Sequence, residues 1–295
     1  MKVLFTTCGL VVLIACCGNW VYPQTPAPVL LTQENSPRAA AVDSVTFTRD
    51  PLAVVSRDNL SRDRRTRLIL FGINLDLLPG ENASAVTARA RDSRSRSYNL
   101  NVEFVGKVPG LDSVTQIVAR LPDQLAQAGD VWISVTLHGQ TSNEVIFNVE
   151  VQTAPRTATL LKRAVINGED NYVDATFSFE HGMNGEQALP FTRNDWDIQF
   201  GNFPDSFHVT MVVDDCSRIQ DMGALNWNDA FQVPVLTAYP VPTSDPPVKA
   251  IVGHMYVVHT KDSETDLYAL FRVEALDPGK SVTISWKSVQ TPESN

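Results

Sequence analysis

The sequence contains few of the residues that build disulfide scaffolds or zinc sites. It has four cysteines and five histidines in 295 residues. Cys8 and Cys16 lie in an N-terminal apolar segment, and the other two, Cys17 and Cys216, are far apart in the chain, so a disulfide framework is not expected. A chain of this length can instead be stabilised by burying apolar side chains.

Long apolar runs and catalytic motifs are also missing. The apolar stretch at residues 3–15 is too short for a membrane-spanning helix, which needs about 20 residues, and is typical of a secretory leader. There is no glycine-rich phosphate loop and no G-x-S-x-G motif. Cys216 follows two aspartates, which disfavour a thiolate nucleophile. We therefore expect a protein that is not an enzyme. A glycan hydrolase that uses loop carboxylates is the catalytic alternative.

The end of the leader, LIAC at 13–16, resembles a bacterial lipobox. In such signals the leader, here residues 1–15, is removed and the cysteine, here Cys16, carries lipid chains that anchor the protein. The alternative is an ordinary signal peptide cut near Thr25, which gives a periplasmic or secreted protein. We expect export, with a lipoprotein at the outer membrane or cell surface as the favoured form. Residues 16–43 are rich in Pro and Ala and are expected to form an extended tether.

The negative charge lies in the C-terminal half of the chain. Residues 44–152 contain 12 Lys/Arg and 12 Asp/Glu, whereas residues 153–295 contain 10 and 19, a balance of −9 that equals the formal charge of the whole chain. This acidity argues against a nucleic-acid partner and against membrane contact other than through the N-terminal lipid. The charge changes near VQTAPRTAT (151–159), which predicts a domain boundary with a linker at 153–158.

The first domain, residues 44–152, is predicted to be an all-β sandwich. Alternating apolar segments bounded by turn residues are typical of strands, and they occur at 43–48, 66–75, 84–92, 98–108, 114–122, 130–139 and 144–151. Seven strands in about 110 residues match the spacing of an immunoglobulin-like fold.

Several turn and strand positions in this domain resemble those of one immunoglobulin-like class. The positions are Gly72, Asn74, Leu75, Pro122, Gly129, Asp130, Val131, Gly139, Ser142 and Asn143. Together they resemble the IPT/TIG domains of exported soil-bacterial proteins. The resemblance implies a β-sandwich that binds partners or acts as a spacer, and it implies no catalytic residues.

The second domain, residues 159–290, is predicted to be an acidic β-sandwich, with a jelly roll as one candidate topology, followed by a tail at 291–295. Strands are expected at 159–166, 172–180, 195–203, 207–215, 250–260, 266–276 and 281–289. The proline-rich region 217–249 is expected to be irregular, either a packed cover or a binding loop.

Two groups of candidate site residues lie in this domain. Asp262, Glu264 and Asp266 place three carboxylates at alternate positions before a strand, which suits calcium, although a solvated turn is the favoured alternative. No cofactor is expected, with calcium as the alternative. Trp196, Trp227 and Tyr239 could contact a sugar or a protein, with core packing as the favoured alternative.

Histidine and arginine patterns give weaker signals. His254 and His259 are five residues apart, which puts them on opposite faces of a strand and argues against a shared metal ion. Arginines cluster at 57–67 and 89–96 with interleaved aspartates. This pattern favours a solvent-exposed face of paired charges over an anion-binding patch.

The sequence therefore predicts an exported, lipid-anchored, non-catalytic binding or scaffold protein of the bacterial cell envelope. Its partner, a protein or a glycan, is not identified by the sequence. The main alternative is a carbohydrate-binding module with calcium-stabilised loops.

Overall fold

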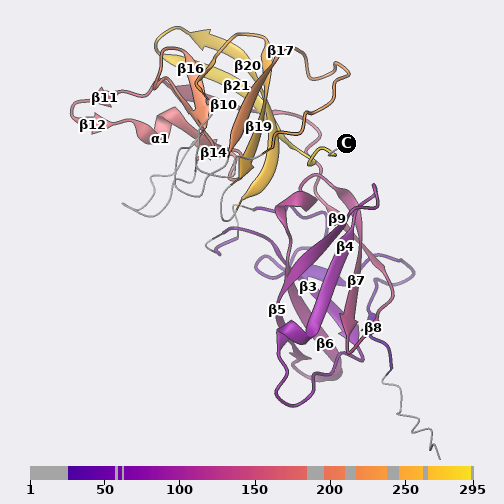
Figure 1. Ribbon diagram of the computed structural model, residues 1–295. Coiled ribbons are helices and arrows are strands. Elements are labelled where there is room, and N and C mark those ends of the chain that lie inside the picture. Colours follow the sequence, from indigo (N-terminus) through magenta and orange to yellow (C-terminus); the bar gives the residue numbers. More distant parts are fainter. Residues whose placement is uncertain are drawn as a thin grey trace, which may run out of the picture.

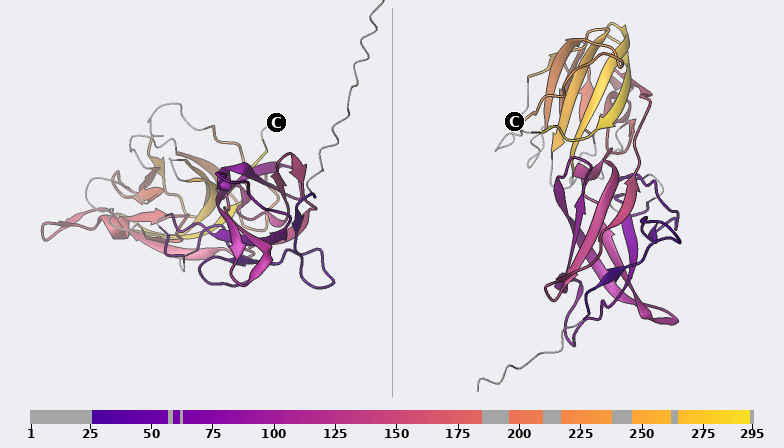
Figure 2. Two further views of the ribbon diagram at one scale, coloured as in Figure 1. Left: turned by 90° about the horizontal axis from the view of Figure 1, so that it is seen from below. Right: turned by 90° about the vertical axis from the view of Figure 1, so that its right-hand side faces the viewer.

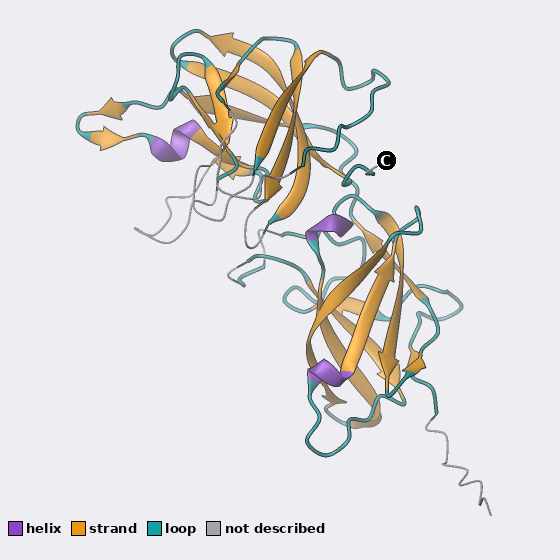
Figure 3. Ribbon diagram, viewed as in Figure 1, coloured by secondary structure: helices purple, strands orange, loops and turns teal. Residues whose placement is uncertain are grey.

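The computed structural model describes residues 26–56, 59–61, 63–184, 196–209, 217–237, 246–261 and 265–293. Two β-sandwiches lie end to end, each with its own hydrophobic core. Strands dominate the described chain, and helical structure is confined to short turns (Figure 3). The prediction of an all-β chain of sandwiches is confirmed.

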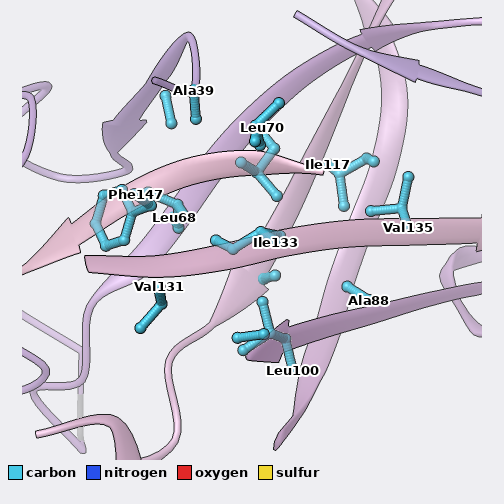
Figure 4. Close-up of a cluster of buried hydrophobic side chains, with 14 of the residues drawn as sticks. Ala39, Leu68, Leu70, Ala88, Leu100, Ile117, Val131, Ile133, Val135 and Phe147 are labelled. Atoms are coloured by element: carbon cyan, nitrogen blue, oxygen red, sulfur yellow. The ribbon is translucent and has the colours of Figure 1, made fainter. Parts of the chain in front are cut away.

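The N-terminal sandwich is one antiparallel sheet of nine strands that folds around a single core. Its strands are β1 (Val29–Leu30), β2 (Ala41–Asp43), β3 (Arg67–Ile73), β4 (Val86–Arg91), β5 (Ser97–Val108), β6 (Leu111–Arg120), β7 (Gly129–Leu137), β8 (Gln140–Thr141) and β9 (Val145–Val149). The long strand β5 pairs with both β4 and β6 and so connects the two faces. Alternate residues of the strands, including Leu68, Ile117, Ile133 and Phe147, point into the core (Figure 4). Two 3₁₀ turns, η1 (Ala83–Ala85) and η2 (Asp123–Leu125), lie between strands.

The predicted tether at 16–43 is wrong for its second half. Strand β1 pairs with β3, and β2 pairs with β3 further along. Leu30 is 2% exposed, and the Asn143 side chain accepts a hydrogen bond from its backbone N–H at 2.8 Å and donates to its carbonyl at 3.1 Å. Proline and alanine content suggested an extended chain, but burial of alternate apolar residues makes residues 29–43 part of the sheet. A strand was predicted at residues 43–48, but β2 ends at Asp43. The Asp43 carboxylate accepts a hydrogen bond from the backbone N–H of Thr46 at 2.7 Å, and the chain turns there.

The C-terminal sandwich consists of two five-stranded antiparallel sheets that enclose an aromatic-rich core. The first sheet has the order β10 (Arg156–Leu161), β21 (Ser281–Val289), β20 (Asp266–Asp277), β19 (His254–Lys261) and β17 (Arg218–Ala224), and the second has the order β14 (Met183–Asn184), β13 (Thr176–Ser178), β15 (Ile198–Phe200), β16 (Ser206–Val209) and β18 (Val248–Lys249). Phe271 lies near the centre of the core, stacked 4.8 Å from Tyr256 and edge-on at 4.9 Å to Phe207.

Three local predictions in this domain need correction. Residues 172–175 form the short helix α1 (Tyr172–Ala175) rather than the start of a strand, and the Thr176 hydroxyl donates to the Tyr172 carbonyl at 3.0 Å where the helix ends. Region 217–249 contains the edge strand β17, which alternation of polar and apolar residues did not reveal. The linker is shorter than predicted, because β10 begins at Arg156.

Part of the proline-rich region is a packed cover, as one of the two interpretations predicted. Residues 225–237 lie over the outer face of β19 and β20 and bury Leu236, Met255 and Tyr268 with their neighbours. The hairpin formed by β11 (Val165–Ile166) and β12 (Glu169–Asp170) projects from the opposite side of the domain (Figure 1).

Candidate functional site

The two sandwiches meet at a junction of buried charged side chains. Arg65, directly before β3, and Asp123, in η2, come from the N-terminal sandwich. Glu180, just after β13, comes from the C-terminal sandwich. Their side chains are 3%, 6% and 11% exposed, so the charges are removed from water and need partners within the protein.

Arg65 joins the two sandwiches. Its Nε and one terminal nitrogen each donate to Asp123 at 2.8 Å, in a bidentate pair. Its other terminal nitrogen lies 3.1 Å from Glu180 Oε1. The Thr265 hydroxyl donates to Glu180 Oε2 at 2.9 Å. One guanidinium therefore serves two carboxylates from different domains. We call these three residues, with Asp197, the junction cluster.

Asp197 places a third carboxylate at the junction cluster. It accepts from the backbone N–H of Phe179 at 2.6 Å and from the Thr260 hydroxyl at 2.7 Å. It is 7% exposed and acts electrostatically on Glu180. Burial raises the pKa of the Glu180 carboxyl, the Arg65 charge opposes this, and the negative charges of Asp123 and Asp197 add to it, so that the pKa is about 8.

The start of β20 is held across the junction as well. The Asp266 backbone N–H donates to Asp123 Oδ2 at 2.8 Å, and the Gln124 amide donates to Asp266 Oδ2 at 3.1 Å. His259 lies 2.9 Å from Asp266 Oδ1, and Lys261 forms an ion pair with Asp266 Oδ2. Burial alone would raise the pKa of Asp266, but the hydrogen bonds from His259 and Lys261 lower it to about 2.

Further contacts join the domains away from this cluster. Arg96 donates to the Thr291 carbonyl at 2.8 Å, and the Gln290 amide donates to buried Asp92 at 3.0 Å, so the start of the predicted tail contacts the N-terminal sandwich. Gln152, directly before the linker, donates to the Trp286 carbonyl at 3.1 Å. The junction is thus a set of specific polar contacts, which favours one relative placement of the two sandwiches.

A cavity of about 270 Å³ lies on one side of the junction cluster. Its walls come from both sandwiches and combine aromatic, amide and charged groups: Val54, Ser56, Asp123, Gln127, Glu150, Gln152, Arg156, Phe179, Glu180, His181, Leu267, Trp286 and Ser288. The Arg156 guanidinium lies 5.8 Å from the centre of the Trp286 ring. Cavities between domains, with apolar walls and a few polar groups, are preferred places for small ligands.

A second hollow, a groove of about 480 Å³, lies on the other side of the cluster. Amide and charged side chains dominate its lining, among them Asn99, Asn101, Gln124, Arg120 and Lys261. Arg67 and Arg120 both bond Asp63, which lowers the pKa of that carboxyl even though burial acts in the opposite direction. Arg65 and Arg67 of the arginine-rich segment therefore have their charges paired with carboxylates, but Arg65 is buried, whereas a solvent-exposed face was predicted.

The two predicted aromatic site residues that the structure describes, Trp196 and Trp227, pack in different parts of the domain. Trp196 is 6% exposed and packs edge-on against Tyr172 at 5.9 Å and His208 at 5.8 Å. Trp227 belongs to the packed cover, where its indole N–H donates to the Ser285 hydroxyl at 2.7 Å. Tyr239 lies outside the described residues. Whether these residues contact a partner stays a prediction.

The predicted calcium and lipid sites lie largely outside the described residues, which exclude Cys16, Asp262 and Glu264. Asp266 is described, and both of its carboxylate oxygens bond protein donors at the junction. In the part of the chain that the structure describes, no three His, Cys, Asp or Glu side chains form a metal-binding group. Among these same residues, no helix is long and apolar enough to cross a membrane.

His254 and His259 lie on opposite faces of β19, as predicted. His254 bonds Asp221 at 2.9 Å, whereas His259 bonds Asp266 and the Leu236 carbonyl and stacks on Tyr268 at 4.2 Å.

Sequence reasoning missed the residues that matter most at the junction. Arg65 stood among other arginines, and Asp123 and Glu180 had no spacing that related them. Only the charge change at 153 marked where two domains meet, and it did not indicate which side chains cross the boundary.

Comparison with known proteins gives no relative. No family model, no curated protein and no solved structure matches the chain. The resemblance of residues 44–152 to IPT/TIG domains stays a prediction, and the fold is established by the strand arrangement alone.

Proposed function

We propose that the chain is an exported, non-catalytic binding protein that captures a small polar ligand, or one end residue of a larger glycan or peptide, between its two sandwiches. The cavity of about 270 Å³ in the junction carries this proposal. A ligand there would contact both domains at once, and the cross-domain hydrogen bonds hold the walls in place before binding, which reduces the entropic cost of association.

The lining suits a ligand with both polar and apolar surface. Phe179 and Leu267 offer apolar contacts, while Ser56, Gln127 and Ser288 carry hydrogen-bonding groups. A cavity of this size holds a ligand smaller than most drug-sized molecules. One sugar ring or one amino-acid residue has the right dimensions.

The test is to fill the cavity. The purified protein is applied to a glycan array and to a library of sugars and amino acids in a thermal-shift assay. We expect Ser288→Phe, which places a ring in the cavity, to abolish the hits of the wild-type protein. Thr283→Phe adds the same ring on the same strand outside the cavity lining and should keep them. Hits that survive Ser288→Phe would place binding elsewhere, and a blank screen for the wild type would refute ligand capture.

The lipobox-like stretch supports attachment to the cell envelope through Cys16. Metabolic labelling with a fatty acid should be lost in Cys16→Ser and kept in Cys17→Ser. Unchanged labelling in Cys16→Ser, or no labelling of the wild type, would show that the protein is released rather than anchored.

A further inference from the structure

The cavity at the junction is lined by two side chains of opposite charge that the described part of the chain leaves unpaired. Arg156 begins β10 of the C-terminal sandwich, and Glu150 directly follows β9 of the N-terminal sandwich. Among the contacts of the described residues, the Arg156 guanidinium contacts only the Trp286 ring, and the Glu150 carboxylate has no hydrogen bond or ion pair. Both residues are exposed, so a ligand that enters the cavity can reach them.

Trp286 and Gly182 shape the cavity wall around the Arg156 guanidinium. Trp286 pairs with Arg156 across β10 and β21, and the guanidinium lies 5.8 Å from the centre of its ring. Gly182 keeps the space beside them open, because a Cβ atom there would lie 3.0 Å from the Trp286 ring and 3.6 Å from an Arg156 nitrogen. A guanidinium on an aromatic ring still has N–H groups that can donate two parallel hydrogen bonds to a carboxylate. This wall therefore suits a carboxylate group of a ligand.

Glu150 places the opposite charge on the wall that the N-terminal sandwich supplies. Its backbone N–H donates to the Leu52 carbonyl at 2.9 Å, which holds this part of the chain beside the cavity. An ionised carboxylate only accepts hydrogen bonds, so its natural partner is an ammonium group. In the described structure Glu150 and Arg156 form no ion pair with each other, although both line the same cavity, so a ligand can lie between their charged ends.

We propose that the cavity takes a free amino acid in its zwitterionic form, with its carboxylate on Arg156 and its ammonium group on Glu150. The assignment rests on the proposed ligand capture and narrows it to one class of ligand. Because Arg156 and Glu150 belong to different sandwiches, the bound amino acid forms one ion pair with each domain.

Other small ligands fit the cavity chemistry less well. A neutral sugar brings no charge to either side chain, and a simple amine or a simple carboxylic acid leaves one of the two without a partner. Phe179 and Leu267, which are 1% and 6% exposed, add apolar surface to the cavity wall. Pockets that combine apolar walls with a few polar groups bind ligands that have both kinds of surface. We therefore expect an amino acid with an apolar side chain.

Isothermal titration calorimetry on the whole protein tests the ligand class. The probes are each standard amino acid and glucose, and the amino acid that binds best is compared with its decarboxylated amine and its deaminated acid. For leucine these are 3-methylbutylamine and 4-methylpentanoate, which keep the same hydrocarbon chain. We expect both analogues to bind about tenfold or more weakly than the amino acid, because each loses the charge-assisted hydrogen bonds of one group.

Two variants assign the two groups of the ligand. Arg156→Gln should weaken binding of the amino acid and of the acid but not of the amine, whereas Glu150→Gln should weaken binding of the amino acid and of the amine but not of the acid. Arg94→Gln and Glu34→Gln change exposed residues outside the cavity lining and should bind as the wild type does. Unchanged affinity for the amino acid in Arg156→Gln or in Glu150→Gln would overturn the assignment.

The probes also separate this assignment from ligand capture itself. Binding of glucose without binding of any amino acid would overturn the assignment and leave ligand capture in place, and a blank result with every probe would count against both. Equal affinities for the amino acid, its amine and its acid would overturn the assignment as well. The comparison of the three analogues uses the wild-type protein, so it remains decisive if a variant does not fold.

Discussion

Arg65→Met is the most informative perturbation of the junction. The substitution keeps the length and apolar stem of the side chain but removes the guanidinium. Asp123, 6% exposed, then loses both of its bidentate hydrogen bonds, and only the Asp266 N–H among the contacts described here still bonds it across the junction. Removing one partner of a buried ion pair costs about 3–5 kcal/mol, because the other charge is left without compensation. Against a total stability of about 5–15 kcal/mol, that is a large fraction.

The assay is urea unfolding at pH 6, combined with a double-mutant cycle. We expect Arg65→Met and Asp123→Leu to be strongly destabilising alone, and the double variant to recover about 2 kcal/mol or more relative to the sum, since it no longer leaves a charged Asp123 without its guanidinium partner. Arg94→Met is the matched control, because Arg94 is exposed, and it should change stability by less than about 0.5 kcal/mol. Additive single effects, or a loss below about 1 kcal/mol in Arg65→Met, would refute the structural role assigned to the pair.

Two further predictions concern positions away from the junction. Asn143→Ala removes both hydrogen bonds to the β1 backbone, so it should lower the free energy of urea unfolding by about 1–3 kcal/mol. It should also increase proteolytic cleavage before residue 40, and unchanged cleavage would contradict the placement of β1 in the sheet. Burial, and to a smaller extent the charge of Arg163, lower the pKa of His208 to about 4 in the folded protein. As pH falls below about 6.5, the His208 side chain therefore takes up a proton in the unfolded chain before it does so in the folded protein. Stability should therefore decline by up to about 3 kcal/mol between pH 6.5 and pH 4, and His208→Phe should remove that part of the slope; an identical pH profile in the variant would show that His208 is not the group responsible.

The strands that the sequence predicted well are those with one buried and one exposed face. Ile133, Val135 and Leu137 alternate with Ser134 and Thr136, and β7 runs where that alternation predicts. Strands with little alternation were placed less well. Strand β17 (RIQDMGA) has one buried residue, Ile219, and lies at the edge of its sheet. Its pairing with β19 was therefore not visible in the alternation of polar and apolar residues.

The candidate site depended on contacts between distant parts of the chain. The pairs Arg65–Glu180 and Asp123–Asp266 are each separated by more than a hundred positions, and no short motif relates their members. An isolated aspartate and an isolated glutamate look like surface residues in an acidic chain, because most of them are. Which carboxylates share the Arg65 guanidinium is decided where the two domains meet.

The sequence by itself determined the all-β character and the position of the charge boundary, since these depend on composition and on alternation along single strands. Only the tertiary structure decided that residues 29–43 belong to a sheet and that one arginine is shared between carboxylates of two domains. The physical reason is that alternation is a local property set by side-chain direction along one strand. Pairing of buried charges depends instead on which surfaces meet, and that is fixed by packing of the whole chain.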